Sequence, residues 1–383
     1  MSSSSSVNDK KKLEEALSPA EHDLQHDLSL SDAEKDLEVE SLAKEMGINH
    51  NRLMWKIDMC VVPPFCLLYF LAFLDRVNIS NAKVYGIEKE LGLHGDQFNT
   101  CLTVFFVPYV VFEVLSNYCL KIVKPHIWLS GMIFLFGIVT ICVAFTKNYG
   151  GLIVCRLFLG VFEAGSFPSI FYIMANFYNK LEAQRRFSIF FSCTCLAGGC
   201  AGALAFRIHD LDGVHGYSSW KWIYLIEGSF TAGLAFLLFF LVTDFPEQAR
   251  FMNQNERDFL KKKLEIYSGN SGFEIKQTWA DIGKVFKEPL LYLAALAYFF
   301  LIVPSYSYAF FAPTIIKLLG YTNMEAQSHS IYPWLVSLGF SIMVAFASDR
   351  MGRRLPFAIL AGIIAIVGLA MKISGYCIRH WFW

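Results

Sequence analysis

Long apolar stretches, separated by short polar segments, dominate the chain from residue 57 onward. A helix that crosses the hydrocarbon core of a bilayer needs about 20 mostly apolar residues. By that measure the pattern predicts nine membrane-spanning helices, the eighth of which is short and contains Pro333. Their expected ranges are 57–80, 99–120, 127–146, 152–175, 187–206, 221–242, 290–311, 331–347 and 356–373.

The pattern therefore predicts an all-α, polytopic membrane protein. The apolar fraction, 55% of 383 residues, is typical of that class and high for a soluble protein. Lys and Arg gather after the second, fourth and eighth predicted helices and in the long segment after the sixth. Because basic loops stay on the cytoplasmic side, we expect the amino terminus and that segment in the cytoplasm.

Four segments follow from this pattern. Residues 1–50 are rich in Ser and in acidic residues, and we expect them to be a disordered cytoplasmic tail. Residues 51–243 form an amino-terminal half of six helices, 244–288 a cytoplasmic linker, and 289–383 a partial carboxyl-terminal half of three helices. This order is the plan of transporters built from two six-helix halves, so we expect the chain to be truncated after the ninth helix.

Four charged residues inside the predicted helices are the main candidates for a site. Asp75 and Arg76 lie in the first helix, and Arg156 and Glu163 lie in the fourth. A charge at the centre of a membrane helix costs about 2.5–3.5 kcal/mol on insertion scales, so it normally faces a partner or a wet cavity. Arg156 and Glu163 share one helix face, about 10 Å apart along the axis. Adjacent residues such as Asp75 and Arg76 point about 100° apart instead.

Two interpretations of these charges remain open. In the functional one, an arginine holds the carboxylate of an anionic substrate, and Asp75 or Glu163 gains and loses a proton during the cycle. In the other, the charges form structural ion pairs between helices. Tyr306 is a further candidate for contact with the substrate, whereas Glu113 and Glu227 are interpreted as structural.

The sequence carries no pattern of a metal site, a cofactor site or a catalytic centre. Its ten cysteines lie mainly in the apolar stretches, and no Cys or His partner gives the spacing of metal ligands. Small, soft packing residues are the simplest interpretation of these cysteines. We expect no enzyme activity, no metal, no cofactor and no nucleic-acid partner, and a monomer in the lipid bilayer.

Several motifs, in order along most of the chain, resemble the major facilitator superfamily. Within it the sequence is most similar to the anion:cation symporter group and its fungal allantoate permease family. The motifs are Phe73-Leu-Asp75-Arg76-Val-Asn78-Ile79, Glu113-Val-Leu-Ser-Asn117, Arg156-Leu-Phe-Leu-Gly160-Val-Phe-Glu163-Ala-Gly165, Trp220-Lys-Trp222 with Glu227-Gly228, Phe311-Ala-Pro313-Thr314, and Asp349-Arg350-Met-Gly352-Arg353-Arg354.

The resemblance implies two six-helix bundles around a central site in the plasma membrane. Members of the family take up small organic anions such as nicotinate, allantoate and other vitamin, nitrogen or sulfur compounds, usually with protons. By motif match, Arg76 and Arg156 would bind the substrate, and Asp75 and Glu163 would couple the proton. The resemblance makes the motif from Asp349 to Arg354 a cytoplasmic gating loop formed by Asp349, Arg350, Gly352, Arg353 and Arg354.

The predicted function is therefore secondary active transport, as proton-coupled symport of a small organic anion. The alternative is a transport-inactive, truncated member of the family or a sensor. That alternative is motivated by the three helices that the two-halves plan would require after residue 383.

Overall fold

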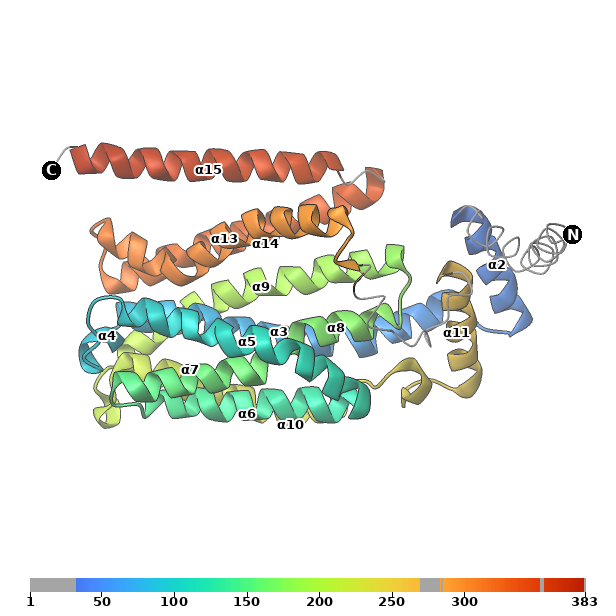
Figure 1. Cartoon of the computed structure of the whole chain (residues 1–383), viewed down its shortest axis with the longest axis horizontal. Coiled ribbons are helices and arrows are strands. Elements are labelled where there is room, and N and C mark those ends of the chain that lie inside the picture. Colours follow the sequence, from blue (N-terminus) through green and yellow to red (C-terminus); the bar gives the residue numbers. More distant parts are fainter. Residues whose placement is uncertain (1–31, 269–282, 284, 352–354, 382–383) are drawn as a thin grey trace, which may run out of the picture.

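The computed structural model describes residues 32–268, 283, 285–351 and 355–381, and in these ranges the chain is helical with short connections and no β-strand (Figure 1). The predicted all-α class is confirmed. Among the described residues, eight helices are long and apolar enough to cross a membrane, and a shorter apolar helical stretch, Pro356–Met371, follows them. This stretch lies within the ninth predicted range.

The first six predicted spans form one bundle. Its helices are α3 (His50–Val84), α5 (Gln97–Ile122), α6 (Pro125–Ala144), α7 (Tyr149–Glu163), α8 (Ser166–Ala175), α9 (Lys180–Ile208) and α10 (Ser219–Leu241). The fourth span consists of two helices, α7 and α8, because Pro168 has no backbone N–H to donate to the carbonyl of Ala164, four residues earlier. This break follows Glu163 directly.

Three further helices lie along one side of that bundle (Figure 1). They are α13 (Pro289–Leu318), α14 (Asn323–Met351) and α15 (Leu355–Trp381). Helix α14 packs along α9, α13 packs along α3, and α15 lies beyond both of them. Helices α13 and α14 expose large apolar side chains, among them Phe300 and Phe346. Such a surface suits contact with lipid.

Glycines allow the helices of the bundle to approach closely. A Cβ added to Gly228 of α10 would lie 2.7 Å from the backbone nitrogen of Ile141 in α6. A Cβ on Gly160 of α7 would overlap the carbonyl oxygen of Phe105 in α5. Small residues at such contacts drive helix association in lipid, where the hydrophobic effect between helices is absent.

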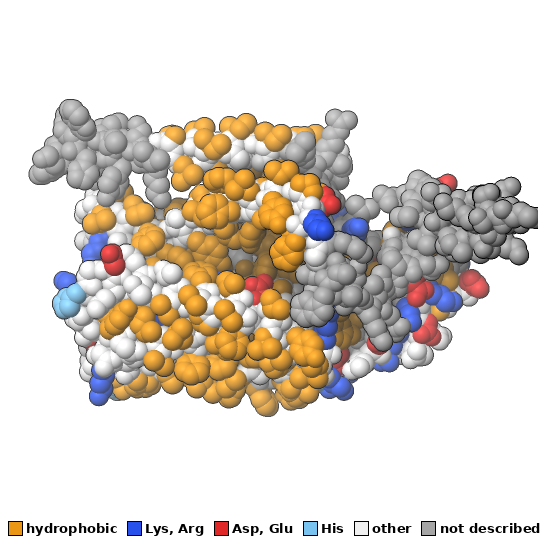
Figure 2. Space-filling model, viewed as in Figure 1, with side chains coloured by type: hydrophobic (Ala, Val, Ile, Leu, Met, Phe, Trp, Pro, Cys, Tyr) orange, Lys and Arg blue, Asp and Glu red, His pale blue; other side chains and the backbone are white. Residues whose placement is uncertain are grey.

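Figure 2 shows apolar side chains over the middle of the molecule and charged ones mostly near its two ends.

The prediction of a disordered tail is wrong for residues 32–45, while residues 1–31 lie outside the described part. From Asp32 to Glu45 the chain forms helix α2, whose Val39 and Ala43 are buried. Helix α2 packs against α11 (Gln254–Ser268) of the linker, which buries Phe259 and Leu260. Composition alone missed this because a few apolar residues at helical spacing are enough to dock an otherwise polar helix.

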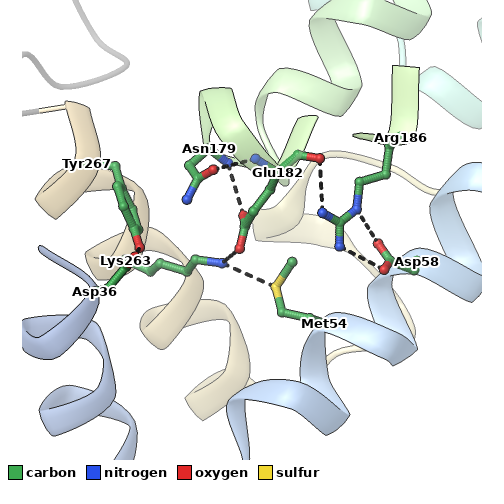
Figure 3. A network of polar contacts seen from close by, with 8 residues as sticks. All are labelled: Asp36, Met54, Asp58, Asn179, Glu182, Arg186, Lys263 and Tyr267. Carbon is green, nitrogen blue, oxygen red and sulfur yellow. Dashed lines mark hydrogen bonds and ion pairs between the residues drawn. The ribbon is translucent and has the colours of Figure 1, made fainter. Parts of the chain in front are cut away.

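A polar network fastens α11 to the bundle (Figure 3). Lys263 of α11 has a side chain that is 0% exposed, and its Nζ lies 2.6 Å from Glu182 Oε1 at the start of α9. Burial lowers the pKa of Lys263, and Glu182 opposes that shift. Glu182 also completes a capping box with Asn179. One helical turn later, Arg186 donates two hydrogen bonds, of 2.9 and 2.8 Å, to the carboxylate of Asp58.

A second cluster ties α4 (Ile87–Glu90) to the start of α10 at the opposite end of the bundle. Glu90 accepts a hydrogen bond of 2.6 Å from Trp220 Nε1, and further bonds from Ser218 and Lys221. Burial alone would raise the pKa of Glu90, but the hydrogen bonds from Lys221, Ser218 and Trp220 hold it below its ordinary value. The carboxylate form of Glu90 is thus stabilised by the fold.

Candidate functional site

The four charged residues predicted from the sequence meet in the interior of the bundle as two ion pairs between α3 and α7. Arg156 Nη1 donates a hydrogen bond of 3.0 Å to Asp75 Oδ2, and Arg76 forms an ion pair with Glu163. The four residues are at most 4% exposed. Each pair neutralises two charges that would otherwise be very costly in a bilayer.

Helix geometry explains this pairing. Arg156 and Glu163 are seven residues apart on α7, so they present a cation and an anion on the same face at two levels. Asp75 and Arg76 are adjacent on α3 and point about 100° apart, so one reaches Arg156 and the other reaches Glu163. The sequence identified all four residues as candidates, but it did not show which acid pairs with which arginine.

Aromatic rings surround the Arg76 guanidinium. Its central carbon lies 5.6 Å from the ring centre of Phe105, 5.2 Å from Tyr109 and 5.6 Å from Tyr306. Arg76 Nη1 also donates a hydrogen bond to the hydroxyl of Tyr306. Cation–π contact of this kind stabilises a partly desolvated cation. Tyr306 comes from α13, so both parts of the described fold contribute to the surroundings of Arg76.

A cavity of about 840 Å³ opens beside Arg76, between the six-helix bundle and helices α13 and α14. Its walls are mainly aromatic, with scattered hydroxyl groups. They include Tyr69, Arg76, Tyr109, Glu113, Tyr306 and Trp334. Such a mixture, largely apolar with a few placed polar groups, is typical of small-molecule sites. Glu113, interpreted as structural from the sequence, lies on this wall.

Arg156, unlike Arg76, does not line this cavity. Its guanidinium is held by Asp75 and, through Nη2, by the hydroxyl of Tyr224 in α10 at 3.1 Å. Tyr224 is fully buried, and no sequence signal singled it out. The arrangement therefore gives the two arginines different surroundings: Arg76 borders the cavity, while Arg156 connects α7 with α3 and α10.

The predicted gating motif is only partly described. Arg350 is exposed at the end of α14, and Asp349 belongs to the same helix. Gly352, Arg353 and Arg354 lie outside the described residues. Within the described part of the chain, no group of three or more His, Cys, Asp or Glu residues has the arrangement to hold a metal ion.

Comparison with known sequences finds one family model and several relatives that match most of this chain. A sequence profile of the Major Facilitator Superfamily matches residues 65–383. An uncharacterised transporter of Schizosaccharomyces pombe is 33% identical over 336 residues, which cover 85% of this chain and 69% of that protein. The high-affinity nicotinic acid transporter of Saccharomyces cerevisiae is 31% identical over 326 residues, 84% of this chain and 60% of that protein. Another uncharacterised transporter of Schizosaccharomyces pombe, 32% identical, is covered over 63% of its length.

Solved structures resemble the fold at low sequence identity. A bacterial homolog of the human lysosomal transporter Spinster, inward-facing and unoccupied, aligns with a TM-score of 0.56 at 16% identity, over 76% of this chain and 62% of that one. The xylose transporter of E. coli, partially occluded and inward-open, aligns with a TM-score of 0.56 at 12% identity, over 76% of this chain and 71% of that one. These likenesses concern the fold alone.

Proposed function

The chain belongs to the Major Facilitator Superfamily, a family of membrane transporters rather than enzymes, and from that premise we propose that it carries a small organic anion together with a proton. The substrate class is a carboxylate, and nicotinate is the first compound to test because a relative is named as a nicotinic acid transporter. The same proposal has the amino terminus in the cytoplasm, on the side of the basic loops, and the protein in the plasma membrane.

One observation carries this proposal: a buried arginine borders a large, mainly aromatic cavity. Arg76 is 4% exposed, yet it lines the 840 Å³ space beside Tyr109 and Tyr306. A guanidinium presents a planar fork of N–H donors that matches a carboxylate, and it is always charged. Aromatic walls suit a planar ring attached to that carboxylate.

Proton coupling follows from the competition that an anion would create. The guanidinium of Arg76 is paired with Glu163, so a substrate carboxylate that binds Arg76 weakens that pair. A buried carboxylate that loses its cation is strongly destabilised, and protonation removes the penalty. In this mechanism anion binding at Arg76 drives proton uptake by Glu163, and the Asp75–Arg156 pair lies at the neighbouring level of the helices.

The purified chain in liposomes allows a direct test. We expect an inward proton gradient to drive accumulation of labelled nicotinate, and little uptake of nicotinamide, which has the same ring without the carboxylate. Arg76→Ala should reduce the initial rate at least tenfold. The matched control is Arg207→Ala, which changes an exposed arginine at the end of α9. Absence of saturable anion uptake by the wild-type chain would contradict the proposal and favour an inactive relative or a sensor.

A double variant separates this mechanism from purely structural ion pairing. Arg76→Gln combined with Glu163→Gln removes both charges, so it leaves neither of them buried without a partner. If the pair serves only to hold α3 against α7, the double variant folds and transports. The proposed mechanism requires that it folds but accumulates no nicotinate.

A further inference from the structure

A third acid lies deep in the six-helix bundle, outside both ion pairs. Glu227 of α10 is 1% exposed. Its Oε2 accepts a hydrogen bond of 2.7 Å from Asn78 Nδ2 in α3. Its Oε1 has no hydrogen-bond partner among the described residues. Asn78 is itself held by Asn81, which also donates to the carbonyl oxygen of Ala201 in α9.

The surroundings of Glu227 do not suit a carboxylate. One hydrogen bond from a neutral amide offsets only a small part of the free energy that it costs to bury a negative charge. The charged groups that face Glu227 are Asp75 and Arg156, and the nearby titratable hydroxyl is that of Tyr224. Arg156 is already engaged by Asp75, and the charge of Asp75 repels a second anion.

A charge count leads to the same conclusion. In the interior of the six-helix bundle, the buried acids of α3, α7 and α10 are Asp75, Glu163 and Glu227, and the buried cations of these helices are Arg76 and Arg156. Three carboxyl groups therefore face two guanidinium groups. With Asp75 and Glu163 each paired to an arginine, Glu227 is the carboxyl group of this set that has no cation of its own.

We propose that Glu227 and Asp75 share one proton, and that Arg156 pairs with whichever of the two is ionised. In the arrangement described, Arg156 pairs with Asp75 and the proton resides on Glu227. When Arg156 turns to Glu227, the O–H bond of Glu227 breaks and an O–H bond forms on Asp75, so charge and protons balance. Asp75 Oδ1 and Glu227 Oε1, which have no hydrogen-bond partner in the part of the chain that the structure describes, are the atoms available for this exchange.

The contacts of Arg156 bring it near both carboxyl groups. Its Nη2 already donates to the hydroxyl of Tyr224, which stands three residues before Glu227 on α10. Asn78, the donor to Glu227, stands three residues after Asp75 on α3. Residues three apart on a helix are neighbours on its surface. This inference rests on the proposed proton coupling and adds a carboxyl group to it.

Infrared spectroscopy of the purified full chain in lipid nanodiscs tests the proposal without a substrate, so the result is independent of whether uptake is detected. We expect wild-type protein at neutral pH to show the carbonyl band of a protonated carboxyl group and Glu227→Gln to lack it. The amide oxygen of Gln can still accept the bond from Asn78. Glu247→Gln, at an exposed position, is the matched control and should retain the band.

The variant Asp75→Asn tests whether Arg156 can pair with Glu227 as well as with Asp75. This change frees the guanidinium of Arg156 to pair with Glu227, so the band that Glu227 contributes should disappear, and adding Glu227→Gln should change nothing further. A band that persists at full size in Asp75→Asn would contradict the proposal that Arg156 can pair with either acid. A wild-type spectrum identical to that of Glu227→Gln would contradict the proposal that Glu227 is protonated. If Glu227→Gln fails to fold, ¹³C labelling of glutamate in the wild type assigns the band, and a band that does not shift contradicts the proposal.

Discussion

The ion pair between Lys263 and Glu182 gives a sharp test of how α11 is held on the bundle. Lys263 is 0% exposed and Glu182 is 20% exposed by side chain, with 2.6 Å between Nζ and Oε1. Changing Glu182→Gln removes the negative charge and leaves a buried ammonium group. Glutamine at this third helical position also preserves the capping box with Asn179, so the start of α9 is unaffected.

The magnitude follows from burial. Removing one partner of a fully buried ion pair costs about 3–5 kcal/mol, and the partial exposure of Glu182 lowers our expectation to about 2–3 kcal/mol. Lys263→Met replaces the ammonium group with an apolar side chain of similar length, and we expect stability within about 1 kcal/mol of the wild type. In the Lys263→Met background, Glu182→Gln should then cost less than about 0.5 kcal/mol.

Unfolding in detergent micelles, followed by tryptophan fluorescence for the four proteins, completes this double-mutant cycle. The cycle isolates the pairwise term because neither substitution introduces a new charge. Equal losses from Glu182→Gln in both backgrounds would refute the reasoning, because the charge of Lys263 would then contribute nothing.

Three further predictions follow from other contacts. Gly160→Ala places a methyl group against the carbonyl of Phe105, and thermal unfolding should show a loss of about 1–3 kcal/mol, whereas an unchanged midpoint would contradict the packing. The folded-state pKa of Glu90 is lowered, so its contribution to stability is present above the unfolded pKa and is lost as the pH falls through the folded value. Protection factors for hydrogen exchange around α4, which are corrected for the intrinsic pH dependence of amide exchange, should therefore fall in acid, and Glu90→Gln should abolish that fall. Arg186→Lys cannot make both hydrogen bonds to Asp58, so it should lower the unfolding midpoint although charge is conserved; a midpoint equal to the wild type would show that the paired geometry is unimportant.

Much of the fold could be predicted from the sequence because membrane helices are recognised by length and apolarity. The six ranges from 57–80 to 221–242 coincide with helices of the bundle, and 290–311 and 331–347 lie within α13 and α14. The docking of α2 and α11 could not be predicted in this way. Both helices are polar on average, and their attachment depends on a few buried residues such as Val39 and Lys263. The partners of these residues lie far away in the sequence, as Glu182 does for Lys263.

For the candidate site, the sequence identified the residue types but not their partners. Charges inside apolar helices stand out in any sequence, so Asp75, Arg76, Arg156 and Glu163 were found. Each acid pairs with the arginine of the other helix. This pairing depends on the relative rotation of α3 and α7, which the amino-acid sequence alone does not reveal. Glu227 also stands out in the sequence, but only the structure shows that it lies outside both ion pairs.

The central claim is that an anion at Arg76 displaces Glu163 and thereby causes proton uptake. Calorimetric titration of nicotinate into the purified chain, in buffers of different ionisation enthalpy, measures the protons taken up on binding. We predict about one proton per bound anion for the wild type at neutral pH, and none for Glu163→Gln, which should still bind. Nicotinate binding with the same proton uptake in both proteins would contradict the account.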